Sequence, residues 1–272
     1  MNPRRPLPFV LAAANHGSMI VNRLDYRMVD EKRGYGVGYQ ILNSACFDPE
    51  EINFVLALLT LRRKHAGDGL MVLDCGANIG AHTIEWARHM HGWGQVLAFE
   101  PQERIFYALA GNIALNNCLN ASARWVALGR ENTTIKIPAP NYLIPSSFGS
   151  LELKQTASTE FIGQDISYDE QQMVPVAQIS IDSLALPRVD LMKIDVEGME
   201  LEVLAGSQAT LEKYKPVLMV EVIKTDLKTL ETTLRGYGYA LFRMGINLLA
   251  VYEQDPVLAH LKLEGEHLNL RM

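Results

Sequence analysis

From Leu70 onward, short apolar runs alternate with amphipathic stretches, and this alternation restricts the possible folds more than any other feature. The amphipathic stretches, such as Ala81–Met90 and Glu103–Asn116, have helical periodicity. The apolar runs are nearly continuous, which is typical of strands buried on both faces of a sheet. The pattern predicts an α/β fold with a mostly parallel sheet and right-handed crossovers. The expected strands are Leu70–Asp74, Gln95–Glu100, Arg124–Leu128, Val189–Asp195 and Pro216–Glu221.

The end of the pattern differs. Two further apolar runs, Tyr239–Arg243 and Leu248–Tyr252, are separated only by the link from Met244 to Asn247. A link this short permits a hairpin but not a parallel crossover. We therefore expect the mostly parallel sheet to close with a C-terminal antiparallel hairpin.

The chain before Leu70 predicts an N-terminal accessory segment. Residues 18–46 have the pattern of strands around a glycine-rich turn, Gly34–Gly38. A helix is then expected, with Asp48 as its cap, Pro49 at its first position and Glu51 completing a capping box. Its apolar face would consist of Ile52, Val55, Leu56 and Leu59.

These patterns divide the chain into residues 1–68 as an accessory or lid segment, 69–255 as the main α/β domain and 256–272 as a C-terminal tail. A long segment rich in Pro, Ser, Thr and Gln, residues 130–188, interrupts the main domain. Insertions of this size are usually functional loops or disordered segments. A flap over the substrate and a surface hairpin are both compatible with its composition.

Composition excludes several classes of protein. The formal net charge is −6, and no cationic stripe suited to nucleic-acid phosphates is visible. The three cysteines are widely spaced, which favours a reducing, cytoplasmic location over a disulfide framework. No apolar run is long enough for a membrane span. The N-terminal Arg4-Arg5 and the following apolar stretch resemble a signal peptide only weakly, because Pro8 interrupts the stretch.

The first strand and first helix are joined by a glycine-bearing loop. The dinucleotide pattern G-x-G-x-x-G would place Asn78 where the backbone must approach a pyrophosphate. The spacing fits D-x-G-x-N-x-G better, with Asp74, Gly76, Asn78 and Gly80 in phase. A strand-end carboxylate and tight-turn amides suit a ligand with an amino-acid head and no phosphate. This loop therefore suits S-adenosylmethionine and suits NAD poorly.

A second acidic residue, Glu100, ends the next strand and is followed by Pro101. An acidic residue about 20 positions after such a loop usually accepts both ribose hydroxyls. Glu100 thus indicates a ribose without choosing between cofactors. Alternatively, Asp74 and Glu100 serve only as polar ends of their strands.

A third group of charged residues lies in the segment from Leu191 to Gly198. Lys193, Asp195 and Glu197 alternate, so they would face one side if the chain stays extended. Asp195 would lie at the carboxyl edge of the sheet, where open α/β folds bind ligands. Lys193 could instead form a structural ion pair with Asp195 or with Glu221, which ends the following strand.

Two other groups are weaker candidates. His89 and His91 are two positions apart on a helix and cannot face one ion, so we expect no metal site there. Cys75 is expected to be a packing residue, because the sequence shows no base to activate its thiol.

Together these segments resemble the FkbM family of S-adenosylmethionine-dependent methyltransferases. The resemblance runs from about Leu70 to Val222 and is most specific in three pieces. These are Val72–Gly80, Phe99–Pro101 and the run Leu191–Gly206, which is similar to K-x-D-x-E-G-x-E-x-x-V-L-x-G. The resemblance covers neither residues 1–68 nor the insertion, so it does not name the acceptor.

The resemblance implies a Rossmann-like methyltransferase fold and methyl transfer to a hydroxyl of a sugar, glycan or polyketide-type natural product. It places Asp74, Gly76, Asn78 and Gly80 at the methionine end of the cofactor and Glu100 at the ribose. We assign the neighbouring Ala77, Pro101 and Leu128 to cofactor binding as well.

For catalysis we expect Asp195 to act as general base or hydroxyl orienter, with Glu197 and Glu221 as further candidates. These carboxylates could also hold Mg²⁺, although we assign no metal ligand. An NAD(P)-dependent oxidoreductase and a non-catalytic cofactor-binding module remain as alternatives. A nucleic-acid methyltransferase is disfavoured by the acidic charge and the lack of an Asn-Pro-Pro-aromatic tetrapeptide.

Overall fold

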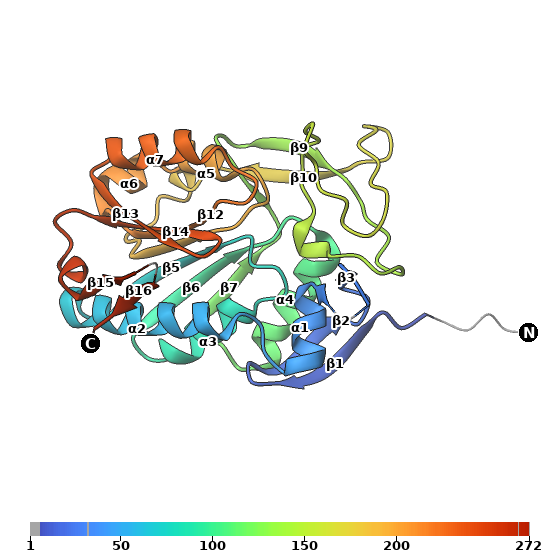
Figure 1. Ribbon diagram of the computed structural model, residues 1–272, viewed down its shortest axis with the longest axis horizontal. Coiled ribbons are helices and arrows are strands. Elements are labelled where there is room, and N and C mark those ends of the chain that lie inside the picture. Colours follow the sequence, from blue (N-terminus) through green and yellow to red (C-terminus); the bar gives the residue numbers. More distant parts are fainter. Residues whose placement is uncertain (1–5, 32, 266, 272) are drawn as a thin grey trace, which may run out of the picture.

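The computed structural model describes residues 6–31, 33–265 and 267–271. Its centre is a seven-stranded sheet in the order β13-β14-β12-β11-β5-β6-β7 (Figure 1). These strands are β5 (Leu70–Cys75), β6 (Gly94–Phe99), β7 (Ala121–Arg124), β11 (Leu191–Ile194), β12 (Val217–Glu221), β13 (Tyr239–Met244) and β14 (Asn247–Tyr252). All pairs are parallel except β12–β14 and β13–β14. The expected α/β fold and its closing antiparallel hairpin are confirmed.

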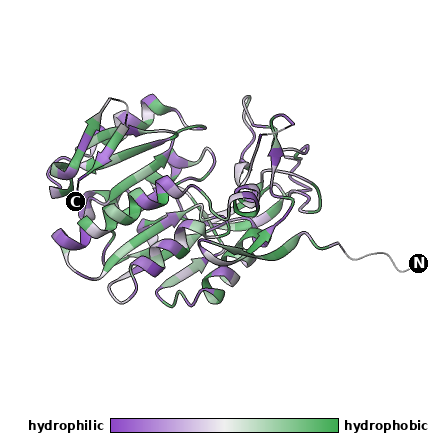
Figure 2. Cartoon of the chain, turned by 60° about the horizontal axis from the view of Figure 1, so that its bottom comes forward, coloured by the Kyte–Doolittle hydropathy of each residue, from purple (hydrophilic) through white to green (hydrophobic). Residues whose placement is uncertain are grey.

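Helices cover both faces of this sheet. The helices that follow the sheet's strands are α3 (Ala81–His89), α4 (Glu103–Leu115), α5 (Glu200–Ala205), α6 (Gln208–Tyr214) and α7 (Leu227–Gly236). In Figure 1, α5, α6 and α7 lie above the sheet, whereas α2 (Pro49–Ala66) and α3 lie below it. Figure 2 shows strongly hydrophobic strands between helices that also carry hydrophilic faces, as expected for a sheet buried on both sides.

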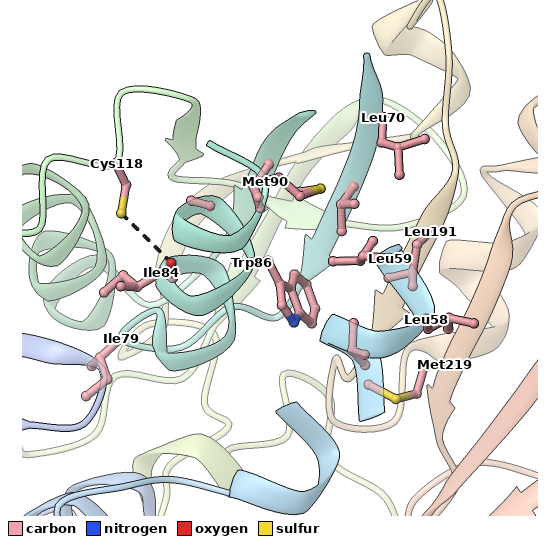
Figure 3. Close-up of a cluster of buried hydrophobic side chains, with 14 of the residues drawn as sticks. Leu58, Leu59, Leu70, Ile79, Ile84, Trp86, Met90, Cys118, Leu191 and Met219 are labelled. Carbon is pink, nitrogen blue, oxygen red and sulfur yellow. Dashed lines mark hydrogen bonds between the residues drawn. The ribbon is translucent and has the colours of Figure 1, made fainter. Parts of the chain in front are cut away.

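The core is divided by the sheet into two clusters. Alternate residues of one strand belong to different clusters: Val72 packs with α2 and α3, whereas Leu73 packs with α5 and α7. Trp86 is fully buried in the first cluster, and Figure 3 shows its ring beside Leu59 of α2 (Figure 3). Helix α2 is therefore part of the main core.

The expected strand Arg124–Leu128 is wrong in one respect. The chain leaves the central sheet after Arg124, and Ala127–Leu128 forms β8 of a separate three-stranded sheet. That sheet also contains β9 (Thr133–Ile137) and β10 (Val174–Ile179), both from the insertion. Three short one-turn helices, Phe148–Ser150, Asp182–Leu184 and Pro256–His260, complete the connections.

The N-terminal segment differs from expectation in one of its elements. It contains the hairpin β1 (Phe9–Ala14) and β2 (Gly17–Asn22) and the short strands β3 (Arg27–Met28) and β4 (Gly34–Tyr35), but residues expected to continue as strands form helix α1 (Val37–Ser44). The hairpin docks on α4, where Asn112 Oδ1 accepts a hydrogen bond from Ile20 N. The apolar stretch that resembled a signal peptide is thus strand β1, while Arg4 and Arg5 lie outside the described residues.

The capping box predicted for α2 does not form among the described residues. Asp48 has a left-handed backbone with φ 36° rather than the extended backbone of a side-chain cap. Glu51 instead lies 3.0 Å from His82 Nε2 and accepts a hydrogen bond from Asn247 Nδ2. All three residues line a cavity next to the helix start. At the other end of the chain, β15 (Leu261–Glu264) pairs with β16 (His267–Leu270) as a hairpin against the core.

Candidate active site

A cavity of about 460 Å³ lies at the carboxyl ends of the central strands. Its wall combines residues from the loop after β5, the ends of β6, β11 and β12, the start of β14, the insertion and the N-terminal segment. This is the edge at which open α/β sheets bind ligands. The volume lies within the range of roughly 300–1,000 Å³ that is usual for small-molecule sites.

The loop after β5 is held by close backbone contacts. Gly76 has φ +84°, and a Cβ at this position would lie 1.8 Å from the carbonyl oxygen of Asp195. The amides of Gly76 and Ala77 both donate to the carbonyl oxygen of Phe99. Gly76 is therefore required by both its backbone conformation and its surroundings, and the loop is fixed to β6 and β11 before any ligand binds.

Glu100 ties the loop to the end of β6. Its carboxylate accepts hydrogen bonds from Asn78 N at 3.1 Å and Gln102 N at 2.8 Å. Burial raises the pKa of Glu100 to about 8; the two backbone hydrogen bonds oppose this rise, and the charges of Asp195 and Asp74 add to it. Glu100 lines the cavity, as do most of the expected cofactor residues: Gly76, Ala77, Asn78, Pro101 and Leu128.

Asp74 and Gly80, in contrast, lie outside the residues that form the cavity wall in the described chain. The Asp74 carboxylate is buried and accepts a 2.5 Å hydrogen bond from the hydroxyl of Thr83. Gly80, with φ +90°, is the residue from which α3 begins. Both residues therefore support the loop and the first turn of α3 from the side away from the cavity.

The catalytic candidates converge on one part of the cavity. Carboxylate oxygens of Asp195, Glu197 and Glu221 lie within 4.8 Å of one another. Strand β11 ends at Ile194 and Glu197 has φ +55°, so the extended chain assumed from the alternation does not continue to Glu197. The turn nevertheless brings all three side chains together in the cavity wall.

Two lysines are paired with this cluster. Lys193 Nζ lies 2.6 Å from Asp195 Oδ2, which confirms the first of the two expected ion pairs. Lys224 Nζ lies 2.6 Å from Glu197 Oε2. Burial raises the pKa of Glu221 to about 8, and the charge of Asp195 adds to the rise. Burial likewise raises the pKa of Glu197, with the Lys224 charge opposing it.

The insertion closes one side of the cavity through Glu160. Its carboxylate lies 3.2 Å from Lys224 Nζ, 3.1 Å from Arg27 Nη1 and 2.5 Å from the Tyr35 hydroxyl. We call these four residues the Glu160 clasp. The clasp joins the insertion to the N-terminal segment and to the loop after β12, and Ser147, Gly149, Ser150, Leu151 and Leu153 of the insertion also line the cavity. These contacts favour the flap over the surface hairpin.

Four wall residues escaped the sequence analysis or received another role: Glu51, His82, Glu160 and Asn247. Lys224, which pairs with Glu160 and Glu197, also escaped it. Their partners lie up to 196 residues away in the chain, as for the Asn247–Glu51 hydrogen bond. Only His82 was accessible to sequence reasoning, because it lies two positions beyond Gly80 in the first turn of the first helix.

The sheet order, with the antiparallel strand β14 inserted next to its edge, is that of the Rossmann-like methyltransferases. We call the loop after β5, residues 76–80, the donor loop. The family model "Methyltransferase FkbM domain" matches residues 74–241. The chain belongs to this family and is an S-adenosylmethionine-dependent methyltransferase. The match decides against the NAD(P)-dependent oxidoreductase considered from the sequence.

Two named methyltransferases are similar in sequence to this chain. Methyltransferase 1 of Beauveria bassiana is 28% identical over 185 residues, which cover 64% of this chain and 74% of the relative. Methyltransferase sdnD of Sordaria araneosa is 25% identical over 216 residues, covering 72% and 78%. Among solved structures, the FkbM methyltransferase of Methylobacillus flagellatus is 17% identical with a TM-score of 0.49; the alignment covers 68% of this chain and 44% of that protein.

The described parts of the chain contain no helix with both the length and the apolar character needed to cross a bilayer. Cys75 and Cys118 are buried free thiols, and burial raises the pKa of Cys75 well above its ordinary value. A raised thiol pKa favours the packing role expected for Cys75.

Proposed function

We propose that the protein transfers the methyl group of S-adenosylmethionine to a hydroxyl of a sugar, glycan or polyketide-type natural product. The observation that supports this best is the cluster of Asp195, Glu197 and Glu221, whose oxygens lie within 4.8 Å of one another in the same cavity as the donor loop. A hydroxyl is a weak nucleophile at neutral pH, and carboxylates at this point can orient it and accept its proton.

The order of the strands supports a division of the cavity into two halves. Residues at the ends of β6 and β8, including Glu100 and Leu128, suit the ribose and adenine of the donor. The ends of β11 and β12 and the start of β14 follow on the other side of the loop after β5. Glu221, Ile223 and Ile246 from those ends would then surround the acceptor.

In this arrangement the cofactor supplies a methyl group already activated by its sulfonium. The residues of this chain align the acceptor oxygen with that group, and alignment alone can lower a barrier by roughly 7–11 kcal/mol. Asp195 would accept the hydroxyl proton. Glu221, with its pKa raised to about 8, is mainly protonated at neutral pH and would donate a hydrogen bond to the acceptor.

The experiment that tests this function is incubation of the protein with methyl-labelled S-adenosylmethionine and fractionated extracts of the source cell. The proposal expects a labelled methyl ether in which the new bond joins the methyl carbon to oxygen. A product labelled on nitrogen, carbon or sulfur would overturn the proposed acceptor chemistry.

A further inference from the structure

His82 and Glu51 form a buried pair in the cavity wall beside the donor loop. The Nε2 atom of His82 lies 3.0 Å from Oε1 of Glu51, and their side chains are 7% and 14% exposed. His82 is the second residue of α3, whereas Glu51 belongs to the first turn of α2. Both residues line the cavity.

Glu51 is a fixed anion. Its other carboxylate oxygen accepts a 2.5 Å hydrogen bond from Asn247 Nδ2. Burial acts to raise the pKa of Glu51, but the contact with His82 and the charge of Lys193 outweigh it and hold the pKa at about 2. Glu51 is therefore ionised at neutral pH and places its negative charge 3.0 Å from Nε2 of His82.

Aromatic neighbours hold the plane of the His82 ring. The ring packs at 89° against Phe47 and at 55° against Trp86, with centroid distances of 5.8 and 5.4 Å. Since Nε2 faces Glu51, Nδ1 is the nitrogen left to contact a ligand. The ring is thus oriented before a ligand enters.

The place of His82 along the cavity indicates which part of the donor it meets. Glu100 suits the ribose of the donor. The loop from Gly76 to Gly80 leads from there to the start of α3, so we expect the amino-acid head to lie toward the first turn of α3. A helix N-terminus favours a carboxylate. Lys193, which is paired with Asp195, adds positive charge near Glu51. Asp74, the acid expected at this end from the sequence, lies outside the wall and contacts Thr83.

We propose that His82, oriented by Glu51, binds the carboxylate of the methionine head of S-adenosylmethionine. In its imidazolium form, in which both ring nitrogens carry a proton, His82 would donate from Nδ1 to the ligand carboxylate while Nε2 keeps its contact with Glu51. This inference rests on cofactor binding alone and is independent of which acceptor is methylated. It makes His82 a cofactor-binding residue and Glu51 a positioning residue.

Calorimetric titration with two ligands tests the proposal without any acceptor. S-adenosylhomocysteine carries the amino-acid head, whereas methylthioadenosine has the adenine, ribose and thioether without the head. His82→Phe keeps an aromatic ring between Phe47 and Trp86 but removes both nitrogens. We expect it to weaken S-adenosylhomocysteine binding about 10- to 100-fold, as for a lost hydrogen bond to a charged group, and methylthioadenosine binding by less than about threefold.

The matched control is His89→Phe, on the same helix, where the imidazole contacts the hydroxyl of Thr60 away from the cavity. It should leave both affinities unchanged. If His82→Phe does not fold, Glu51→Gln keeps the imidazole and should still weaken only the ligand with the head. Equal losses for both ligands, or no loss for S-adenosylhomocysteine, would overturn the proposal.

Discussion

The carbonyl oxygen of Asp195 occupies the space that a side chain on Gly76 would need, with an added Cβ only 1.8 Å away. This contact joins the donor loop to the end of β11, where the catalytic candidates lie. The proposed donor and acceptor halves of the cavity thus meet through backbone atoms, and this contact blocks a shift of the loop toward the Asp195 segment.

Gly76→Ala should therefore both unfold more easily and lose cofactor affinity. Gly92→Ala is the matched control: Gly92 has φ +80°, close to the +84° of Gly76, but nothing lies within 4 Å of its added Cβ. Gly92→Ala should lower the free energy of unfolding by only about 1–2 kcal/mol, the cost of a left-handed backbone for a residue with a Cβ. Gly76→Ala should lower it clearly more. Denaturant unfolding measures both. Equal losses in the two variants would show that the contact with Asp195 is unimportant.

Glu221 should make stability depend on pH. The pKa of Glu221 is raised from 4.5 to about 8, so the folded state keeps a proton that the unfolded chain releases near 4.5. The stabilisation from this proton is full below pH 4.5 and is lost as pH rises toward 8. The Tm should be lower at pH 8 than at pH 6. This difference should be smaller in Glu221→Gln than in the unmodified protein. An unchanged difference would mean that Glu221 titrates normally.

Glu160→Gln should loosen the insertion. It removes the charge that Lys224 and Arg27 share in the Glu160 clasp. Limited proteolysis should cleave the insertion faster in this variant than in the unmodified protein. Glu170→Gln, in the same insertion, removes only an exposed pair with Lys136 at 3.7 Å and should leave cleavage unchanged, since exposed pairs contribute little. Similar rates in both variants would rule out a closing role for the clasp.

Chelation should leave methyl transfer intact. Asp195 and Glu197 already have lysine ammonium groups at 2.6 Å, so a divalent cation would compete with the charges of Lys193 and Lys224 for these carboxylates. We expect the same initial rate with and without EDTA, measured with labelled donor and an acceptor fraction. A loss of activity that Mg²⁺ restores would show instead that the carboxylate cluster binds a metal.

The sequence predicts the strands that support this site better than it predicts the side chains that line the cavity. The alternation from Leu70 predicts the parallel sheet because buried strands must be apolar on both faces, and the strand-end position of Glu100 places it in the cavity. The equally placed Asp74 faces Thr83 instead. Strand-end position alone cannot distinguish these two environments, because the partner of each carboxylate is set by tertiary packing.

Pairs between distant segments were not predictable. Glu51 has the spacing of a capping box, but a buried imidazole and the amide of Asn247 compete successfully for its carboxylate. Glu160 lies in a polar insertion with no periodic pattern, and its role depends on Arg27 and Lys224 arriving from other parts of the fold. Such contacts leave no local pattern in the sequence.

The most direct test of the account is the activity of Asp195→Asn, because Asp195 lies where the donor loop meets the carboxylate cluster. The account predicts a loss of turnover of about 10²- to 10⁴-fold, the usual contribution of a general base, with S-adenosylhomocysteine affinity within threefold of the unmodified protein. Glu202→Gln is the control, since Glu202 pairs only with the exposed Lys154 among the ion pairs described. Unchanged turnover in Asp195→Asn would contradict the central claim that this carboxylate acts on the acceptor.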